Sequence, residues 1–234
     1  MRPFLCLLLV STSMLARDAM QGFTADDLKG VLTISEIATA QRWSIDLAKL
    51  PIRLSDCEVQ EKCYVGEFCS GVCVRSAQMV GVDETRRRVY FIVNTGHSQN
   101  PPKVLFQYNL ATRVARKLTT DSGVGMAWLL VSPNGRYLAY AMWWHLGLTC
   151  PPLSTATVVD LQTARLASVK GWILEGSEQT WSVAINDIKW LSNSRLAVEA
   201  TIRDGRCRKD DTPDWDTVGE PKRQVVNAGA LRYR

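Results

Sequence analysis

The chain has 234 residues, of which 46% are hydrophobic and 22% are charged, and its formal net charge is +5. This length allows one large domain or two small ones, and the composition is that of a globular protein, which excludes disorder of the whole chain. The 28 Lys and Arg residues are interspersed with 23 Asp and Glu residues, so the positive charge forms no footprint for a nucleic acid. The densest basic run, residues 86–88, falls on an expected hairpin turn, where a solvated turn is favoured over a phosphate site.

The first residues predict export. Arg2 precedes the short apolar run Phe4–Val10, and small residues follow between Ser11 and Ala16. This is the pattern of a secretory signal peptide, which we expect over residues 1–19, with the mature domain over residues 20–234. The apolar run is too short to span a membrane, so we expect a periplasmic or secreted protein without a membrane span. A buried N-terminal strand is the alternative interpretation.

The cysteines agree with export. Removal of Cys6 with the signal peptide leaves an even set, which an oxidising compartment makes a disulfide framework: Cys57, Cys63, Cys69, Cys73, Cys150 and Cys207. The first four have the spacing C-x5-C-x5-C-x3-C, which fits the paired knuckles of zinc sites poorly. We therefore favour disulfides over zinc and expect no metal or other cofactor. The first four should pair among themselves, and Cys150 should pair with Cys207.

Past residue 28 the chain has the pattern of strands and turns. Thr24–Asp27 has the pattern of a helix cap and predicts one short helix before Leu28. After it, apolar runs of strand length are separated by turn residues. Three hairpins are similar to one another: Val82–Phe91, Val131–Tyr140 and Ile188–Val198.

A second repeated unit follows the first two hairpins. Leu105–Arg113 and Ala156–Ala164 both end in Asn/Asp-Leu-x-Thr, and a further short strand is expected after each, over 114–118 and 165–169. Residues 42–49 are an earlier half-copy. A four-stranded antiparallel unit repeated about every fifty residues is typical of propeller blades, which must stack to bury both faces. A β-sandwich is the alternative.

Two of these turns carry a family resemblance. Ser132–Ala139 (SPNGRYLA) resembles the S-P-D-G-R-x-L-A turn of TolB-like, WD40-like propeller repeats, and Val159–Thr163 resembles their D-L-x-T-G turn. Asn134 and Gly135 suit a tight turn, since both tolerate positive φ. The first hairpin departs from the motif at 83–86. The resemblance implies an all-β fold, a β-propeller of about four blades or a partial propeller.

The N-terminal region carries a second resemblance. A signal peptide, a short helix and propeller strands in this order are similar to the start of exported prolyl-oligopeptidase-type serine peptidases, including the lasso-peptide isopeptidases. In those enzymes an α/β-hydrolase domain performs the chemistry, and that domain is absent from this sequence.

No set of catalytic residues is found in the sequence. The string closest to a nucleophile elbow, Gly96–Asn100, lacks the second glycine, and His97 and His145 are the only histidines. The acidic stretch Asp210–Asp216 has oxygen ligands for calcium but not the order of a calcium loop. Basic residues adjoin it, so salt pairing on a solvated loop is favoured.

The long insertions all fall between the second and third strands of the expected units, at Asn94–Lys103, Trp143–Ser154 and Arg203–Glu220. In a propeller such loops emerge on one face. Exposed aromatic side chains among charges are typical of recognition surfaces, and the candidate binding face consists of Trp143, Trp144, His145, Arg206, Asp214 and Trp215. Alternatively, the tryptophans cover a small core of their own loop.

We therefore expect an exported, non-catalytic module that binds a protein, a peptide or a glycan, with no nucleic-acid partner and the oligomeric state left open. The alternative is the substrate-gating propeller of a serine peptidase whose hydrolase domain is encoded elsewhere.

Overall fold

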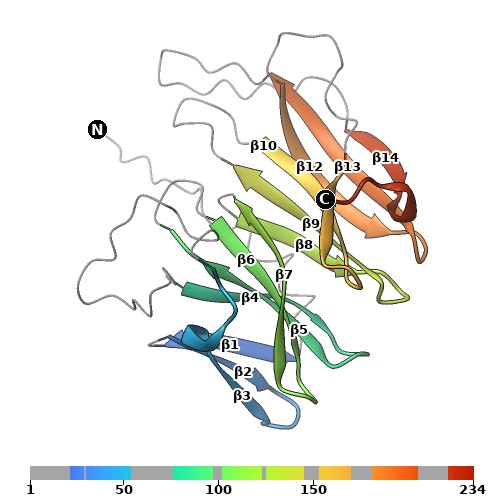
Figure 1. Ribbon diagram of the computed structural model, residues 1–234. Coiled ribbons are helices and arrows are strands. Elements are labelled where there is room, and N and C mark those ends of the chain that lie inside the picture. Colours follow the sequence, from blue (N-terminus) through green and yellow to red (C-terminus); the bar gives the residue numbers. More distant parts are fainter. Residues whose placement is uncertain are drawn as a thin grey trace, which may run out of the picture.

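The computed structural model describes residues 22–28, 30–53, 76–96, 102–122, 125–144, 153–169, 181–204 and 221–234. Four antiparallel sheets follow one another along the chain, each made of consecutive strands (Figure 1). Sheet 1 contains β1 (Phe23–Leu28), β2 (Val31–Glu36) and β3 (Arg42–Asp46). Sheet 2 contains β4 (Ser76–Asp83), β5 (Arg88–Asn94), β6 (Pro102–Asn109) and β7 (Val114–Ser122). Sheet 3 contains β8 (Gly125–Val131), β9 (Tyr137–Trp144), β10 (Leu153–Asp160) and β11 (Arg165–Ser168). Sheet 4 contains β12 (Trp181–Trp190), β13 (Arg195–Asp204) and β14 (Lys222–Asn227). The short 3-10 helices η1 (Leu47–Lys49) and η3 (Ala228–Ala230) follow β3 and β14.

The helix predicted over Thr24–Asp27 is wrong, because these residues form β1. The Asp27 carboxylate does not cap a helix there; it accepts a hydrogen bond of 2.7 Å from the backbone N–H of Ala77, at the start of β4. A capping pattern predicts a helix only when an apolar stripe of helical period follows. Here β2 follows instead, alternating buried and half-buried residues, and every residue of β1 pairs with it.

The repeated hairpins are confirmed. The three predicted hairpins are β4–β5, β8–β9 and β12–β13, and the predicted outer strands are β7 and β11. The two Asn/Asp-Leu-x-Thr turns also have the same structure. The side chains of Asn109 and Asp160 each accept hydrogen bonds from the backbone two and three residues ahead, and Arg113 and Ala164 adopt the same left-handed φ near +58° and +57°.

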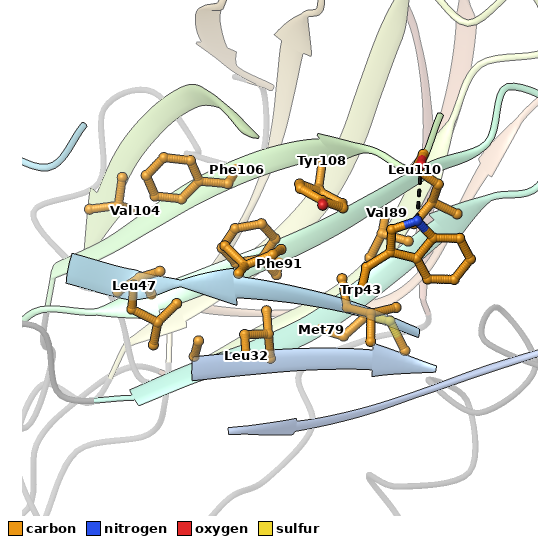
Figure 2. Packing of buried hydrophobic residues seen from close by; sticks show 14 of the residues in the cluster. Leu32, Trp43, Leu47, Met79, Val89, Phe91, Val104, Phe106, Tyr108 and Leu110 are labelled. Atoms are coloured by element: carbon orange, nitrogen blue, oxygen red, sulfur yellow. Dashed lines mark hydrogen bonds between the residues drawn. The ribbon is translucent and has the colours of Figure 1, made fainter. Parts of the chain in front are cut away.

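The hydrophobic core is divided into three clusters, one between each pair of successive sheets. The first joins sheets 1 and 2 and includes the stacked rings of Phe91 and Phe106, 5.3 Å apart (Figure 2). The second joins sheets 2 and 3 around Tyr90 and Tyr140, and the third joins sheets 3 and 4 around Tyr137 and Ile188. Each interior sheet therefore supports two cores, as expected for stacked units that cannot bury both faces alone.

This arrangement explains the sequence patterns of the strands. In β5, Val89–Val93 are all buried, since one face meets sheet 1 and the other meets sheet 3. In β2 buried residues alternate with half-buried ones, since the described residues cover one face of sheet 1. A continuous apolar run therefore marks a sheet inside the stack, and strict alternation marks a sheet at its end.

Sheets 2, 3 and 4 run in the same direction. The Arg86 side chain, in the β4–β5 turn, donates to the carbonyl of Pro133 in the β8–β9 turn at 2.8 Å, so equivalent turns are neighbours. Likewise the indole N–H of Trp190, at the end of β12, donates to the carbonyl of Leu130, near the end of β8, at 3.0 Å.

Sheet 1 is inverted relative to sheet 2. Glu36, at the end of β2, forms a two-point ion pair with Arg87 in the β4–β5 turn. The indole N–H of Trp43, near the start of β3, donates to the carbonyl of Leu110 at the end of β6 at 2.9 Å (Figure 2). The β2–β3 turn of sheet 1 therefore lies beside the β4–β5 turn of sheet 2, which would not occur between blades of equal direction.

The all-β class and the four antiparallel sheets agree with the prediction, whereas the described sheets form no closed ring, and the predicted partial propeller stays a prediction. Successive sheets contact one another through β1 and β4, β4 and β8, and β8 and β12. The half-copy at residues 42–49 does form a strand, β3, but within the inverted sheet.

Candidate functional site

Most of the predicted site lies outside the described residues. This is true of every cysteine and of much of the candidate binding face: Cys57, Cys63, Cys69, Cys73, Cys150, Cys207, His145, Arg206, Asp214 and Trp215. The disulfide pairs therefore remain predictions. Trp143 and Trp144 are the last two residues of β9.

The common direction of sheets 2–4 gives this part of the molecule two different ends. The short-turn end carries the described turns at 84–87, 110–113, 132–136, 161–164 and 191–194. The long-connection end is the opposite one, where β5 is joined to β6, β9 to β10 and β13 to β14 through residues 95–101, 145–152 and 205–221. The three insertions therefore join second to third strands, as predicted, and start from one end of three sheets of equal direction.

Trp143 lies at the long-connection end and packs on its own sheet. It pairs with Gly125 of β8 and Ser154 of β10. The indole covers Gly125 so closely that a Cβ atom there would lie 2.1 Å from Cζ2 of the ring. Trp143 remains half-buried. The indole therefore covers its own sheet and keeps an accessible side, and its part in a binding face stays a prediction.

A polar row that the sequence analysis missed crosses sheet 2 at the same end. Its members are register partners on four adjacent strands: Ser76, Asn94, Lys103 and Asp121. The Asn94 side chain donates to the Ser76 hydroxyl at 2.8 Å and accepts from Lys103 Nζ at 2.7 Å. From sheet 3, the Tyr140 hydroxyl donates to the Asp121 carboxylate at 3.1 Å.

Burial dominates the electrostatics of this row. Lys103 is 4% exposed, and burial lowers the pKa of its ammonium group. Tyr140 is fully buried, and both burial and the neighbouring Asp121 carboxylate raise the pKa of its hydroxyl well above the ordinary value. At neutral pH the row thus holds a neutral phenol that donates to a carboxylate.

The centre of the row at Lys103 and the adjoining Tyr140 are buried, which suits support rather than catalysis. Lys103 and Tyr140 expose too little surface to meet a substrate. Next to the row, the N–H and the hydroxyl of Thr95 both donate to the carbonyl of Pro102, at 3.0 and 3.1 Å, which fixes the two strands where residues 95–101 leave the sheet. The row thus gives the long-connection end a rigid base. Only the strand register, which the sequence pattern left undefined, could have revealed it.

The part of the chain that the structure describes contains no group of three or more His, Cys, Asp or Glu side chains able to hold a metal ion. None of its helices is long and apolar enough to cross a membrane.

Comparisons with known proteins add little. No family model matches this sequence, and no curated protein matches it. Among solved structures, hydrazine synthase of Kuenenia stuttgartiensis is similar with 11% identity and a TM-score of 0.38, over 78% of this chain. The chain spans about half of that protein, 49% of its length, and a likeness at this level carries no argument about function.

Proposed function

We propose that this chain is an exported, non-catalytic module that binds a protein, peptide or glycan through the long-connection end of sheets 2–4. The observation that supports the proposal is the common direction of these sheets, which brings the ends of three long connections to one side of a rigid stack. Loops on a rigid scaffold are where binding residues concentrate. Trp143 adds a half-buried aromatic ring at this end.

The alternative, a gating propeller of a peptidase, has less support. A blade of a larger ring must offer an apolar face to the next blade. The outer face of sheet 1 instead carries Thr24, Asp26 and Ser44, all exposed. The outer face of sheet 4 carries the exposed residues Lys189 and Arg223. The described residues of these two faces are thus largely polar, although the face of sheet 4 also exposes Val225.

Site-specific photo-crosslinking tests the proposal. A photoreactive amino acid at Ser154, beside Trp143, should crosslink to an exported ligand in a saturable manner that unlabelled protein competes away. The matched control places the same group at Gln162, which is exposed in a turn of the same sheet at the short-turn end. Equal labelling from both positions, or labelling from Gln162 alone, would contradict the proposed face. Hydrolysis of a peptide substrate by the purified chain would contradict the non-catalytic assignment.

Export is tested separately by the mass of the protein recovered from the periplasm of a Gram-negative host. Removal of roughly the first 13 to 19 residues is expected. An intact Met1 on the recovered protein would exclude a cleaved signal peptide.

A further inference from the structure

A polar cavity of about 230 Å³ lies between sheets 1 and 2 at the short-turn end. It is lined by Gln41, Trp43, Arg87, Leu110, Ala111 and Arg113. We propose that this cavity binds an oxyanion, of the size of a phosphate, sulfate or carboxylate group. The cavity lies at the opposite end of sheet 2 from the proposed ligand-binding face, so the two proposals can fail independently.

The equivalent turn of sheet 3 provides an internal comparison. In sheet 2 the N–H of Leu110 donates to the carbonyl of Arg87, and in sheet 3 the N–H of Leu161 donates to the carbonyl of Arg136, at 2.9 and 2.8 Å. Arg87 and Arg136 therefore occupy the same place in their sheets, and the turns that follow have the same cap and the same left-handed residue.

Two differences make the sheet 2 turn more positive. Asn109 stands where sheet 3 has Asp160, so a carboxylate is missing, and Arg113 stands where sheet 3 has Ala164, so a guanidinium is added. Within the described part of the chain Arg113 has no ion-pair partner.

The first arginine has different partners in the two sheets, and the hairpin turns also differ in backbone conformation, since the left-handed residue is Arg87 in sheet 2 and Gly135 in sheet 3. In sheet 3, Arg136 pairs with Asp160 of its own sheet at 3.4 Å. In sheet 2, Arg87 instead reaches Glu36 of sheet 1, and its guanidinium lies over the ring of Trp43, 5.7 Å from the centroid. The ion pair with Glu36 and the contact with the Trp43 ring hold Arg87 at the cavity wall.

The contacts of Arg87 leave donors for a ligand. Its two Nη atoms each donate to Glu36, and a guanidinium has five N–H groups in all, so others remain for an anion. Arg113, which has a second guanidinium group, and Gln41, which has a side-chain amide, also line the cavity. The negative charges of Glu36 and Glu84 offset the positive charge of Arg87, whereas Arg113 has no ion-pair partner among the described residues. Guanidinium groups bind carboxylate and phosphate oxygens with two parallel hydrogen bonds, so the donor set matches an oxyanion.

Titration calorimetry of the full chain with sodium phosphate, sodium sulfate and sodium acetate tests the proposal at constant ionic strength. At least one anion should bind with one site per chain. Arg113→Ala should weaken binding by about tenfold or more, the loss expected for a charge-assisted hydrogen bond. Asn109→Asp should weaken anion binding equally, because it introduces the carboxylate that sheet 3 has at the equivalent position. The turn should be retained, since aspartate caps the same turn in sheet 3. Arg165→Ala, an exposed arginine next to the equivalent turn of sheet 3, should leave binding unchanged.

The relative affinities distinguish the ligand classes. Preference for phosphate and sulfate over acetate would assign the cavity to a phosphate or sulfate group, and the reverse preference would assign it to a carboxylate. Circular dichroism of each variant shows whether its fold is retained, and the two variants change the cavity in different ways. No binding of any of the three anions, or equal binding by wild type, Arg113→Ala and Asn109→Asp, would overturn the proposal.

Discussion

Replacing Trp43 by phenylalanine tests whether sheet 1 is inverted on sheet 2. Trp43 and Leu110 are both 3% exposed, and the indole N–H is the donor to the Leu110 carbonyl. Phenylalanine keeps an aromatic ring but leaves that carbonyl without its partner, which costs about 1–3 kcal/mol for a buried group. The smaller ring also buries roughly 40 Å² less apolar surface, which lowers the stability by about a further 1 kcal/mol at roughly 25 cal/mol per Å².

The expected loss of about 3 kcal/mol should lower Tm by about 6–12 °C for a chain of this length. Thermal and urea unfolding of the two proteins measure it. The matched control is Trp190→Phe, which removes an indole hydrogen bond of similar length between sheets 4 and 3. Trp190 and Leu130 are only half-buried, so water replaces the lost donor and the cost should be about 1 kcal/mol. A larger effect of Trp190→Phe than of Trp43→Phe, or a Tm unchanged by Trp43→Phe, would refute the inverted packing.

Three further predictions concern charge and turn geometry. Glu36→Arg and Arg87→Glu should each destabilise the fold, and the double exchange should recover part of the lost stability. The pKa of Glu36 is lowered, first by its hydrogen bond from Arg87. The stability advantage of wild type over Glu36→Gln should therefore be present at neutral pH and fade as pH falls below about 4.5. Additive losses in the double exchange would contradict this contact. Gly135→Ala should lower the free energy of unfolding by about 1 kcal/mol or more, because φ of Gly135 is +71° and the new Cβ would lie 2.2 Å from Nε of Arg86. The same substitution should destabilise less in an Arg86→Ala background. Equal losses in the two backgrounds would show that Arg86 does not cover the turn. Because burial lowers the pKa of Lys103, the unfolded chain binds the proton of this side chain more tightly than the folded chain does. Wild type should therefore gain stability relative to Lys103→Gln as pH rises toward 10.5, the ordinary pKa of lysine, and a pH-independent difference would contradict the burial of Lys103.

The strands and turns of sheets 2–4 could be predicted because their signals are local. Period-two runs bounded by Asn, Asp, Gly and Ser define β4–β5, β8–β9 and β12–β13, and a repeated Asn/Asp-Leu-x-Thr turn defines the step to the outer strand. The same local reasoning failed at β1, where polar residues at 24–27 have the pattern of a helix cap. Their conformation is set by pairing with β2, a contact that a cap motif does not contain.

The direction of sheet 1 could not be predicted, because it depends on side chains that are far apart in the sequence. Sheet 1 is positioned by Glu36 with Arg87 and by Trp43 with Leu110. None of these residues has an unusual sequence context by itself. The polar row was missed for the same reason, since Lys103 and Asn94 become neighbours only when the register of β5 and β6 is known.

The inversion of sheet 1 and the polarity of the outer faces are related. In a ring of equal blades every sheet has two apolar faces, as sheets 2 and 3 have here. In sheet 1 the covered face carries Leu32 and Ile34 of β2, and the other face carries Thr33 and Ser35, which alternate with them along the strand. A sheet with one apolar face can cover the end of a stack in either direction, because no further sheet has to continue beyond it. A few specific contacts can then set the direction of sheet 1. The ion pair between Arg87 and Glu36 is the contact that supports the inverted direction, because Asn109 offers Arg87 no carboxylate within its own sheet.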